Sequence, residues 1–212
     1  MVIRELKPSQ RVEGRWLAVL DDGSILRLGV NQIADFALYA GKALTEAEAE
    51  ALTAAAHLSR VREKAVSLLS VRPMSRKEFI QKLTARPRDR EKPPLASPEE
   101  AEEIAGWLER LGYLDDAAYA RTVARHYAAK SCGARKIQDE LYRRGVPREY
   151  WDAALAELDD PAEDIDAFLR KKLAGKEPDR KELKRAADAL ARRGSGWSEI
   201  SDALRRYGNE IE

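Results

Sequence analysis

A fifteen-residue pattern occurs twice in the C-terminal half of the chain and constrains the fold more than any other feature. The segments LYRRGVPREYWDAAL (141–155) and LARRGSGWSEISDAL (190–204) align without a gap. The shared residues lie 49 positions apart: Leu141 and Leu190, Arg143 and Arg192, Arg144 and Arg193, Gly145 and Gly194, Ala154 and Ala203, Leu155 and Leu204. A repeat at this spacing is typical of arrays of small structural units.

Each unit is expected to contain three short helices. Apolar residues follow helical spacing, and Lys and Arg gather before the glycine that ends a helix, where they favour the helix dipole. Residues 60–112 match more loosely, with Leu83 and Arg86 in the places of Leu141 and Arg144. A short helix with one apolar stripe buries it only against its neighbours, so the sequence predicts three three-helix units in tandem.

Capping residues mark the expected helix starts. A capping box places Glu three residues after the N-cap side chain. The pairs are Thr45 and Glu48, Ser75 and Glu78, and Asp179 and Glu182. Ser97 precedes Pro98, which favours the first helical position. Gly112 closes one helix and Asp115 begins the next, so we interpret 112–116 as a structural joint.

The N-terminal segment is expected to be β-rich. The runs 16–20 and 24–28 flank Asp22-Gly23, a strong hairpin signal, and VIREL (2–6) adds a third strand. A sheet this small needs to dock on the helices that follow. The predicted fold is mostly α, an elongated tandem array of three three-helix repeats with a small N-terminal β-hairpin or sheet. Its expected parts are residues 1–44 (β-rich), 45–112 (first repeat, with a long leading helix and a proline-rich loop at 87–98), 113–160 (second repeat) and 161–212 (third repeat).

Composition and motifs exclude several classes of function. The single cysteine, Cys132, cannot form an intrachain disulfide, which fits a reducing, cytoplasmic setting. No apolar run reaches the roughly 20 residues of a membrane span, and the first residues lack a secretory h-region. The chain has no phosphate-cradling glycine loop, and His57 and His126 lack metal-ligand spacing. Capping explains the carboxylate pairs 115–116 and 159–160. We expect no catalytic residue, no metal and no cofactor.

Charge is segregated although the net charge is only +1. Residues 72–92 and 121–150 each carry eight Lys or Arg against three Asp or Glu, and 169–193 carry ten against four. Segments 97–120 and 151–168 are strongly acidic. Basic helices in successive repeats suit a phosphate backbone or an acidic protein groove. The candidate contact residues are Arg135, Lys136, Arg143, Arg144, Lys171, Lys172, Lys181, Lys184, Arg185, Arg192 and Arg193.

Aromatic residues near these clusters have two interpretations. Tyr127 and Tyr142 flank the second basic cluster and could stack on bases, but helix packing is the favoured role for both. Packing is also the favoured role of the four tryptophans: Trp16, Trp107, Trp151 and Trp197.

The motifs resemble those of the RecX family of recombination regulators. LERLGYLDDAAYA (108–120), the segment GARKIQDELYRRGVP (133–147) and a weaker third copy carry the resemblance, which covers nearly the whole chain. The N-terminal hairpin, ADFALYAGKALTEAEAEAL and REKAVSLLSVRPMSRKEFIQKL are similar to the longer members. Two departures are the long proline-rich loop 87–98 and Gly194-Ser195-Gly196, where the family usually has a proline.

The resemblance implies a regulator rather than an enzyme. Members of the family bind the RecA recombinase and the groove of its filament on single-stranded DNA, and limit filament assembly, ATP hydrolysis and strand exchange. Some bind free single- or double-stranded DNA. We therefore expect a cytoplasmic monomer that regulates RecA negatively, with no membrane partner. The alternative is a sequence-specific DNA-binding regulator built from helix-turn-helix-like units, which predicts base discrimination and a palindromic site.

Overall fold

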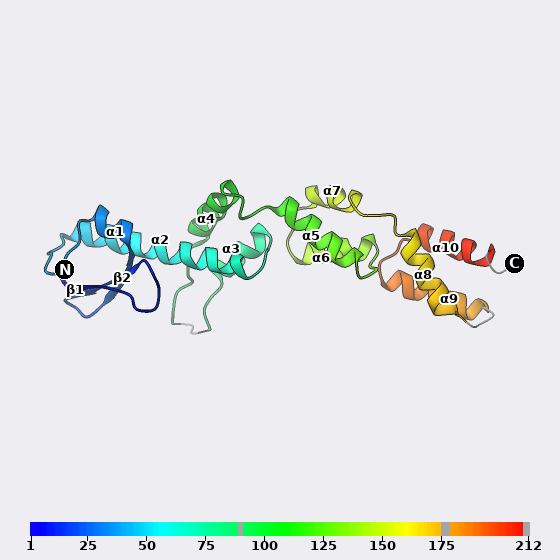
Figure 1. Cartoon of the computed structure of the whole chain (residues 1–212), viewed down its shortest axis with the longest axis horizontal. Coiled ribbons are helices and arrows are strands. Elements are labelled where there is room, and N and C mark those ends of the chain that lie inside the picture. Colours follow the sequence, from blue (N-terminus) through cyan, green and yellow to red (C-terminus); the bar gives the residue numbers. More distant parts are fainter. Residues whose placement is uncertain (89–90, 175–178, 210–212) are drawn as a thin grey trace. The chain divides into compact units, whose positions relative to one another are not determined.

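The computed structural model describes residues 1–88, 91–174 and 179–209 (Figure 1). Within these residues the chain is mostly helical, with one small antiparallel sheet, which confirms the expected fold class. The strands are β1 (Ile3–Pro8), β2 (Arg15–Leu20) and β3 (Ile25–Gly29). The helices are α1 (Val30–Asp35), α2 (Glu46–Val71), α3 (Arg76–Thr84), α4 (Pro98–Arg110), α5 (Asp116–Ala128), α6 (Ala134–Arg143), α7 (Trp151–Ala156), α8 (Ala162–Leu173), α9 (Arg180–Arg192) and α10 (Trp197–Asn209), with one 3-10 turn (Arg148–Tyr150) before α7.

The chain divides into two compact units by its internal contacts. One comprises Met1–Arg72 and Leu83–Ile104, and the other comprises Pro73–Lys82 and Ala105–Glu212. The first contains the sheet and the long helix α2. The second contains the start of α3, the end of α4 and the two helix triplets α5–α7 and α8–α10, drawn from green through yellow to red in Figure 1.

In the first unit, the three strands pair in the order β1-β2-β3. Gly23 has φ +83°, and the N–H of Leu20 donates to the carbonyl oxygen of Ser24 at 2.9 Å, so the predicted hairpin turn is confirmed. Ile3, Leu20 and Leu28 are almost fully buried in one core with residues of α2. The small sheet therefore has the helical support that its size requires.

Helix α1 was not predicted from the sequence. It follows β3 directly and is only six residues long, too short for a periodic apolar pattern to be visible. The side chain of Gln32 accepts a hydrogen bond from the N–H of Gly29 at 2.8 Å, which satisfies one donor at the helix start.

The predicted helix starts are confirmed by their hydrogen bonds. Each N-cap oxygen accepts from the backbone N–H three residues later. These contacts join Thr45 to Glu48 (3.2 Å), Ser75 to Glu78 (3.1 Å), Ser97 to Glu100 (3.2 Å), Asp115 to Ala118 (2.8 Å) and Asp179 to Glu182 (2.7 Å). Gly112 has φ +74° after α4, as expected of a residue that closes a helix.

Each triplet of the second unit has its own apolar core. In α5–α7 the core contains Tyr119, Val123, Ile137, Leu141 and Trp151. In α8–α10 the core contains Ile165, Leu169, Leu190, Ile200 and Ala203. Leu141 and Leu190 thus occupy the same place in the two triplets, as the 49-residue spacing requires.

At two equivalent places in the second unit, the carbonyl oxygen of an arginine that precedes glycine accepts a hydrogen bond from the start of another helix. We call α3, α6 and α9 the middle helices, and Arg144-Gly145 and Arg193-Gly194 the Arg-Gly turns. The N–H of Gly133, before α6, donates to the carbonyl oxygen of Arg193 at 2.9 Å. The hydroxyl of Ser75, before α3, donates to the carbonyl oxygen of Arg144. In both cases the start of one middle helix binds the turn that ends the next.

Glycine is required in the turn Arg193-Gly194, which contacts the start of α6. Gly194 has φ +90°, and a Cβ added there would lie 2.4 Å from the backbone nitrogen of Lys136. The N–H of Arg135 also donates to the carbonyl oxygen of Gly194 at 3.2 Å. A side chain at this position would therefore strain the turn and force the two segments apart.

Gly194→Ala is expected to lower the free energy of unfolding by roughly 2 to 4 kcal/mol, because a strained φ and a backbone clash add. Gly112→Ala is the matched control, since Gly112 has a similar φ but open space around its Cβ. This control substitution should lower the free energy of unfolding by only about 1 to 2 kcal/mol. Urea unfolding of both variants measures the difference, and equal costs would show that the close approach contributes nothing.

Candidate functional site

Nine of the eleven candidate basic residues are solvent-exposed, and Lys136 and Arg144 are half-buried. Most lie on α6 and α9 or in the turns that follow them, and Lys171 and Lys172 lie on the last turn of α8. The equivalent pairs on the two middle helices are Arg135 and Lys184, Lys136 and Arg185, Arg143 and Arg192, and Arg144 and Arg193, each 49 residues apart. Two repeats therefore present the same pattern of cations.

One group of these cations surrounds a small hollow between α8 and α9. Lys172, Arg185 and Arg192 line it with two carboxylates, Glu182 and Asp188, and its volume is about 340 Å³. Lys172 lies 20 residues before Arg192 in the chain. The fold thus brings together basic residues from two helices around a space that suits a phosphate group.

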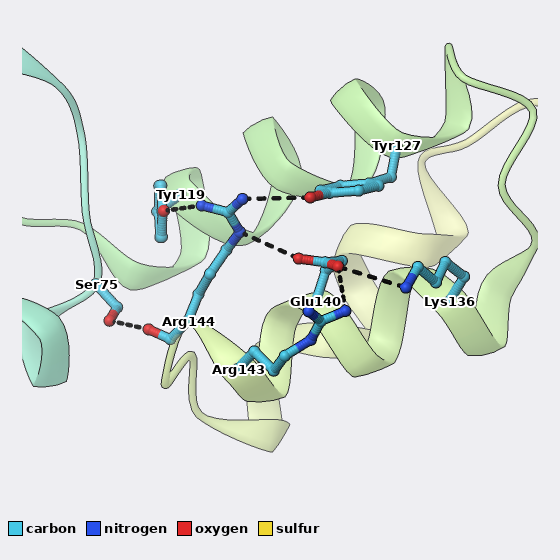
Figure 2. Close-up of polar contacts among 7 residues, drawn as sticks. All are labelled: Ser75, Tyr119, Tyr127, Lys136, Glu140, Arg143 and Arg144. Carbon is cyan, nitrogen blue, oxygen red and sulfur yellow. Dashed lines mark hydrogen bonds and ion pairs between the residues drawn. The ribbon is translucent and has the colours of Figure 1, made fainter.

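Arg144 differs from the other candidates because its guanidinium group is engaged inside the α5–α7 triplet (Figure 2). It donates to the hydroxyl of Tyr119 at 3.1 Å and to that of Tyr127 at 3.4 Å. Its Nε lies 3.9 Å from a carboxylate oxygen of Glu140, an ion pair without a hydrogen bond. These contacts join α5 to the end of α6, so Arg144 stabilises the triplet.

Glu140 is the anion at the centre of this cluster. It is buried, yet Arg143, Arg144 and Lys136 all lie within ion-pair distance of its carboxylate. Burial alone would raise the pKa of Glu140, but a hydrogen bond from Tyr127 and the charges of the three cations outweigh it and hold the pKa below its usual value. The hydrogen bond with Tyr127 likewise raises the already high pKa of Arg144, with burial opposing and Tyr119 assisting. Both groups are charged near neutral pH.

In the third repeat an arginine is again present at the turn, but the residues equivalent to Tyr119 and Glu140 have no hydroxyl and no carboxylate. Arg193 lies over the ring of Phe168, 4.5 Å from the ring centroid. Phe168 stands 49 residues after Tyr119, and Ala189 stands 49 residues after Glu140. The arginine of this repeat therefore has a cation–π contact where Arg144 has a hydroxyl and a carboxylate.

The aromatic predictions are confirmed only in part. Tyr127 is half-buried and binds Arg144, so packing is its role. Tyr142 is 71% exposed and Trp197 is 68% exposed, so the packing interpretation is wrong for both. Trp151 is buried and donates to the carbonyl oxygen of Val146 at 3.0 Å, as packing predicts. Tyr142, next to Arg143, is thus available to a ligand.

The predicted capping roles of the carboxylate pairs hold for some members. Asp115 caps α5, and Asp160 accepts from the N–H of Ala162 at 3.0 Å. Asp116 instead accepts from the N–H of Arg76 at 2.8 Å, tying the start of α3 to α5, and its burial raises its pKa. Among the described residues, no group of His, Cys, Asp or Glu could hold a metal ion. Nor does any helix in that part of the chain have the length and apolarity to cross a membrane.

Three-helix repeats with equivalent basic positions define the class of the molecule, a helical-repeat protein. The profile of the second three-helix domain of RecX matches residues 115–155. The regulatory protein RecX of Chlorobium limicola is 32% identical over 144 residues, 67% of this chain and 86% of that protein. That of Xanthomonas axonopodis pv. citri is 33% identical over 145 residues, 68% and 85% of the two chains. The chain belongs to the RecX family.

Other relatives match over shorter spans. The regulatory protein RecX of Cronobacter sakazakii is 31% identical over 103 residues, and the alignment spans 48% of this chain and 62% of that relative, less than two thirds of its length. A crystal structure of regulatory protein RecX shares the fold with a TM-score of 0.68 and 22% identity, covering 95% of this chain and 98% of the other. The crystal structure of RecX from Lactobacillus salivarius shares the fold with a TM-score of 0.62 and 20% sequence identity. The match covers 71% of this chain and 96% of the other.

Arg144→Ala is expected to lower the free energy of unfolding by about 2 kcal/mol, because two tyrosine hydroxyls lose a charged donor. Arg143→Ala is the control, since the Arg143 side chain is 60% exposed and adjoins the same Glu140. It should change stability by less than about 1 kcal/mol. Thermal and urea unfolding measure both. Equal losses would contradict the structural role of Arg144.

Glu140→Gln tests the electrostatics of the same cluster. Because the folded-state pKa of Glu140 is lowered, its stabilisation is present above the unfolded value near 4.5 and is lost as pH falls through the folded pKa. The wild-type protein should exceed the variant by roughly 1 to 3 kcal/mol at pH 7, and the gap should close below about pH 4.5. A gap independent of pH would indicate lost packing instead of lost charge.

Proposed function

We propose that this protein is a negative regulator of the RecA recombinase that acts as a monomer and without catalysis of its own. It binds RecA and the RecA filament on single-stranded DNA, and thereby limits filament assembly, ATP hydrolysis and strand exchange. The relatives above carry the name regulatory protein RecX, and membership of that family supports the proposal. The observation that carries the binding argument is the repeated set of exposed cations on α6 and α9.

Equivalent cations on successive repeats suit a ligand that is itself periodic. A DNA strand within a protein filament presents phosphates at regular intervals, and each neutralised phosphate releases a counterion. The hollow is lined by three cations, Lys172, Arg185 and Arg192, against two carboxylates, and this excess of positive charge suits a phosphate group. Tyr142, exposed beside Arg143, adds a ring on which a base can stack. The proposed contacts with DNA are therefore mainly to the backbone and blind to sequence.

The decisive experiment measures ATP hydrolysis by RecA on single-stranded DNA while this protein is titrated at fixed salt. Inhibition is expected well below one protein per RecA, because a regulator that limits filament growth acts on many subunits at once. Hydrolysis that stays unchanged at excess folded protein, with RecA from the same source, would refute the proposal. Discrimination between DNA sequences would instead favour a sequence-specific DNA-binding regulator.

Arg135→Glu combined with Lys184→Glu reverses one equivalent pair of cations. Both residues are exposed, and among the described residues neither side chain takes part in the Glu140 cluster. Affinity for single-stranded DNA should fall by about tenfold or more at low salt, and the slope of affinity against salt should become shallower. Fluorescence anisotropy at several salt concentrations measures both.

Arg4→Glu combined with Arg27→Glu is the matched control, because it makes the same change of charge at exposed positions on the N-terminal sheet. If the two double variants lose affinity equally, net charge and not the face on α6 and α9 determines binding. Unchanged inhibition of RecA by the first variant would remove Arg135 and Lys184 from the proposed interface.

A further inference from the structure

A second cleft of the second unit is lined by residues of both triplets and shares no lining residue with the basic hollow. Its volume is about 730 Å³, within the usual range of ligand-binding pockets. Residues of α6, the segment after α7, α8 and α9 line it. Arg193 is the only candidate basic residue that the lining includes. The proposed DNA contacts therefore do not account for this cleft.

The larger apolar residues among those that line the cleft are called its floor. Six side chains from both triplets form it: Ile137, Leu155, Leu158, Ile165, Phe168 and Leu190. Leu155, Leu158 and Phe168 are only partly buried, at the edges of the two separate cores. Apolar surface of this kind is available to an apolar side chain of a partner.

The charged residues among those that line the cleft are called its rim, and they are mostly acidic. Six carboxylates, Glu157, Asp159, Asp160, Glu163, Asp164 and Glu199, face two cations, Arg125 and Arg193. Some are occupied, since Glu157 pairs with Arg121 and Arg125, and Glu199 accepts from the N–H of Gly196.

Three of the six carboxylates make no such ion pair or hydrogen bond with the described residues. Asp159, Glu163 and Asp164 are exposed, and within residues 1–88, 91–174 and 179–209 their side chains form no hydrogen bond or ion pair. No group of ligand-type side chains in those ranges could hold a metal ion, so metal binding does not explain them. The rim thus presents negative charge to whatever enters the cleft.

A cleft that combines apolar lining residues with an excess of carboxylates selects the chemistry of its occupant. Carboxylates repel the phosphates of a nucleic acid and attract Lys and Arg side chains. A protein segment with basic residues on both sides of one large apolar residue would satisfy the rim and the floor together. We propose that this cleft binds such a basic, apolar-anchored segment of a partner protein. Taking that partner to be RecA rests on the function proposed above.

The single cysteine of the chain provides a direct probe. Cys132 lines the cleft and is partly exposed, and no other cysteine competes for a thiol reagent. The rate at which a maleimide alkylates Cys132 would be measured with and without RecA, in the absence of DNA. RecA is expected to slow alkylation at least about threefold, because an occupant of the cleft covers the thiol.

Asp159→Asn, Glu163→Gln and Asp164→Asn together remove the three unpaired charges with little change of shape. This triple variant should bind RecA about tenfold more weakly and lose the protection of Cys132, while its affinity for single-stranded DNA is unchanged or higher. The matched control combines Asp35→Asn, Glu50→Gln and Asp152→Asn, exposed carboxylates outside the cleft. The control should behave as the wild-type protein in every assay.

A synthetic peptide separates this proposal from the proposed function. A short Lys-rich peptide with one central Leu is expected to protect Cys132 in the wild-type protein, whereas a Glu-rich peptide and a Lys-rich peptide with central Ala are not. Failure of RecA to bind, with the Leu peptide still protective, would refute the RecA function alone. Lack of protection by both RecA and the Leu peptide would refute the cleft. Equal affinity of the triple variant and the wild-type protein for RecA would also refute the proposal that the cleft binds a basic segment.

Discussion

The contact between the start of one middle helix and the Arg-Gly turn after the next supports the whole second unit. The first N–H groups of a helix and its last carbonyl groups lack partners within the helix. In this protein the N–H of Gly133 and the carbonyl oxygen of Arg193 satisfy one another across two repeats. The positive end of one helix dipole thereby meets the negative end of another, so the contact gains electrostatic energy as well as a hydrogen bond. Glycine at position 194 permits this approach because no side chain could fit there.

The arginine side chain of each Arg-Gly turn contacts residues of its own repeat instead of the neighbouring one. Arg144 joins two tyrosine hydroxyls and a buried glutamate, and Arg193 stacks on Phe168. A two-residue turn thus links repeats through its backbone and closes a repeat through its side chain. The exposed candidate cations on α6 and α9, such as Arg135 and Lys184, can vary without loss of the fold, because their side chains lie outside the cores.

Local signals made most of the fold predictable. The capping boxes, the hairpin at Asp22-Gly23 and the 49-residue spacing depend on neighbouring residues or on a repeated pattern, and the structure bears them out. Helix α1 was missed because six residues do not reveal a period. Arg143 and Arg144 are indistinguishable in the sequence, yet one is exposed and the other is bound. The partners that separate them, Tyr119 and Tyr127, lie 25 and 17 residues away on another helix. The acidic cleft could not be predicted either, because its carboxylates follow the pattern of helix caps and its floor comes from two repeats.

At both joints the carbonyl oxygen of an Arg-Gly turn accepts a hydrogen bond from a helix start, and this has a consequence for how such a chain can change its length. At each joint the start of one middle helix binds the turn after the next, and at the α3 joint Asp116 of α5 binds the same helix start. The intervening helices differ in length and sequence between the two copies. If a triplet were duplicated together with its Arg-Gly turn, the carbonyl oxygen of the new turn could accept a hydrogen bond from an existing helix start in the same way. Growth or shortening by whole triplets therefore requires no newly evolved junction, and the reach of such a protein along a periodic ligand can be adjusted in discrete steps.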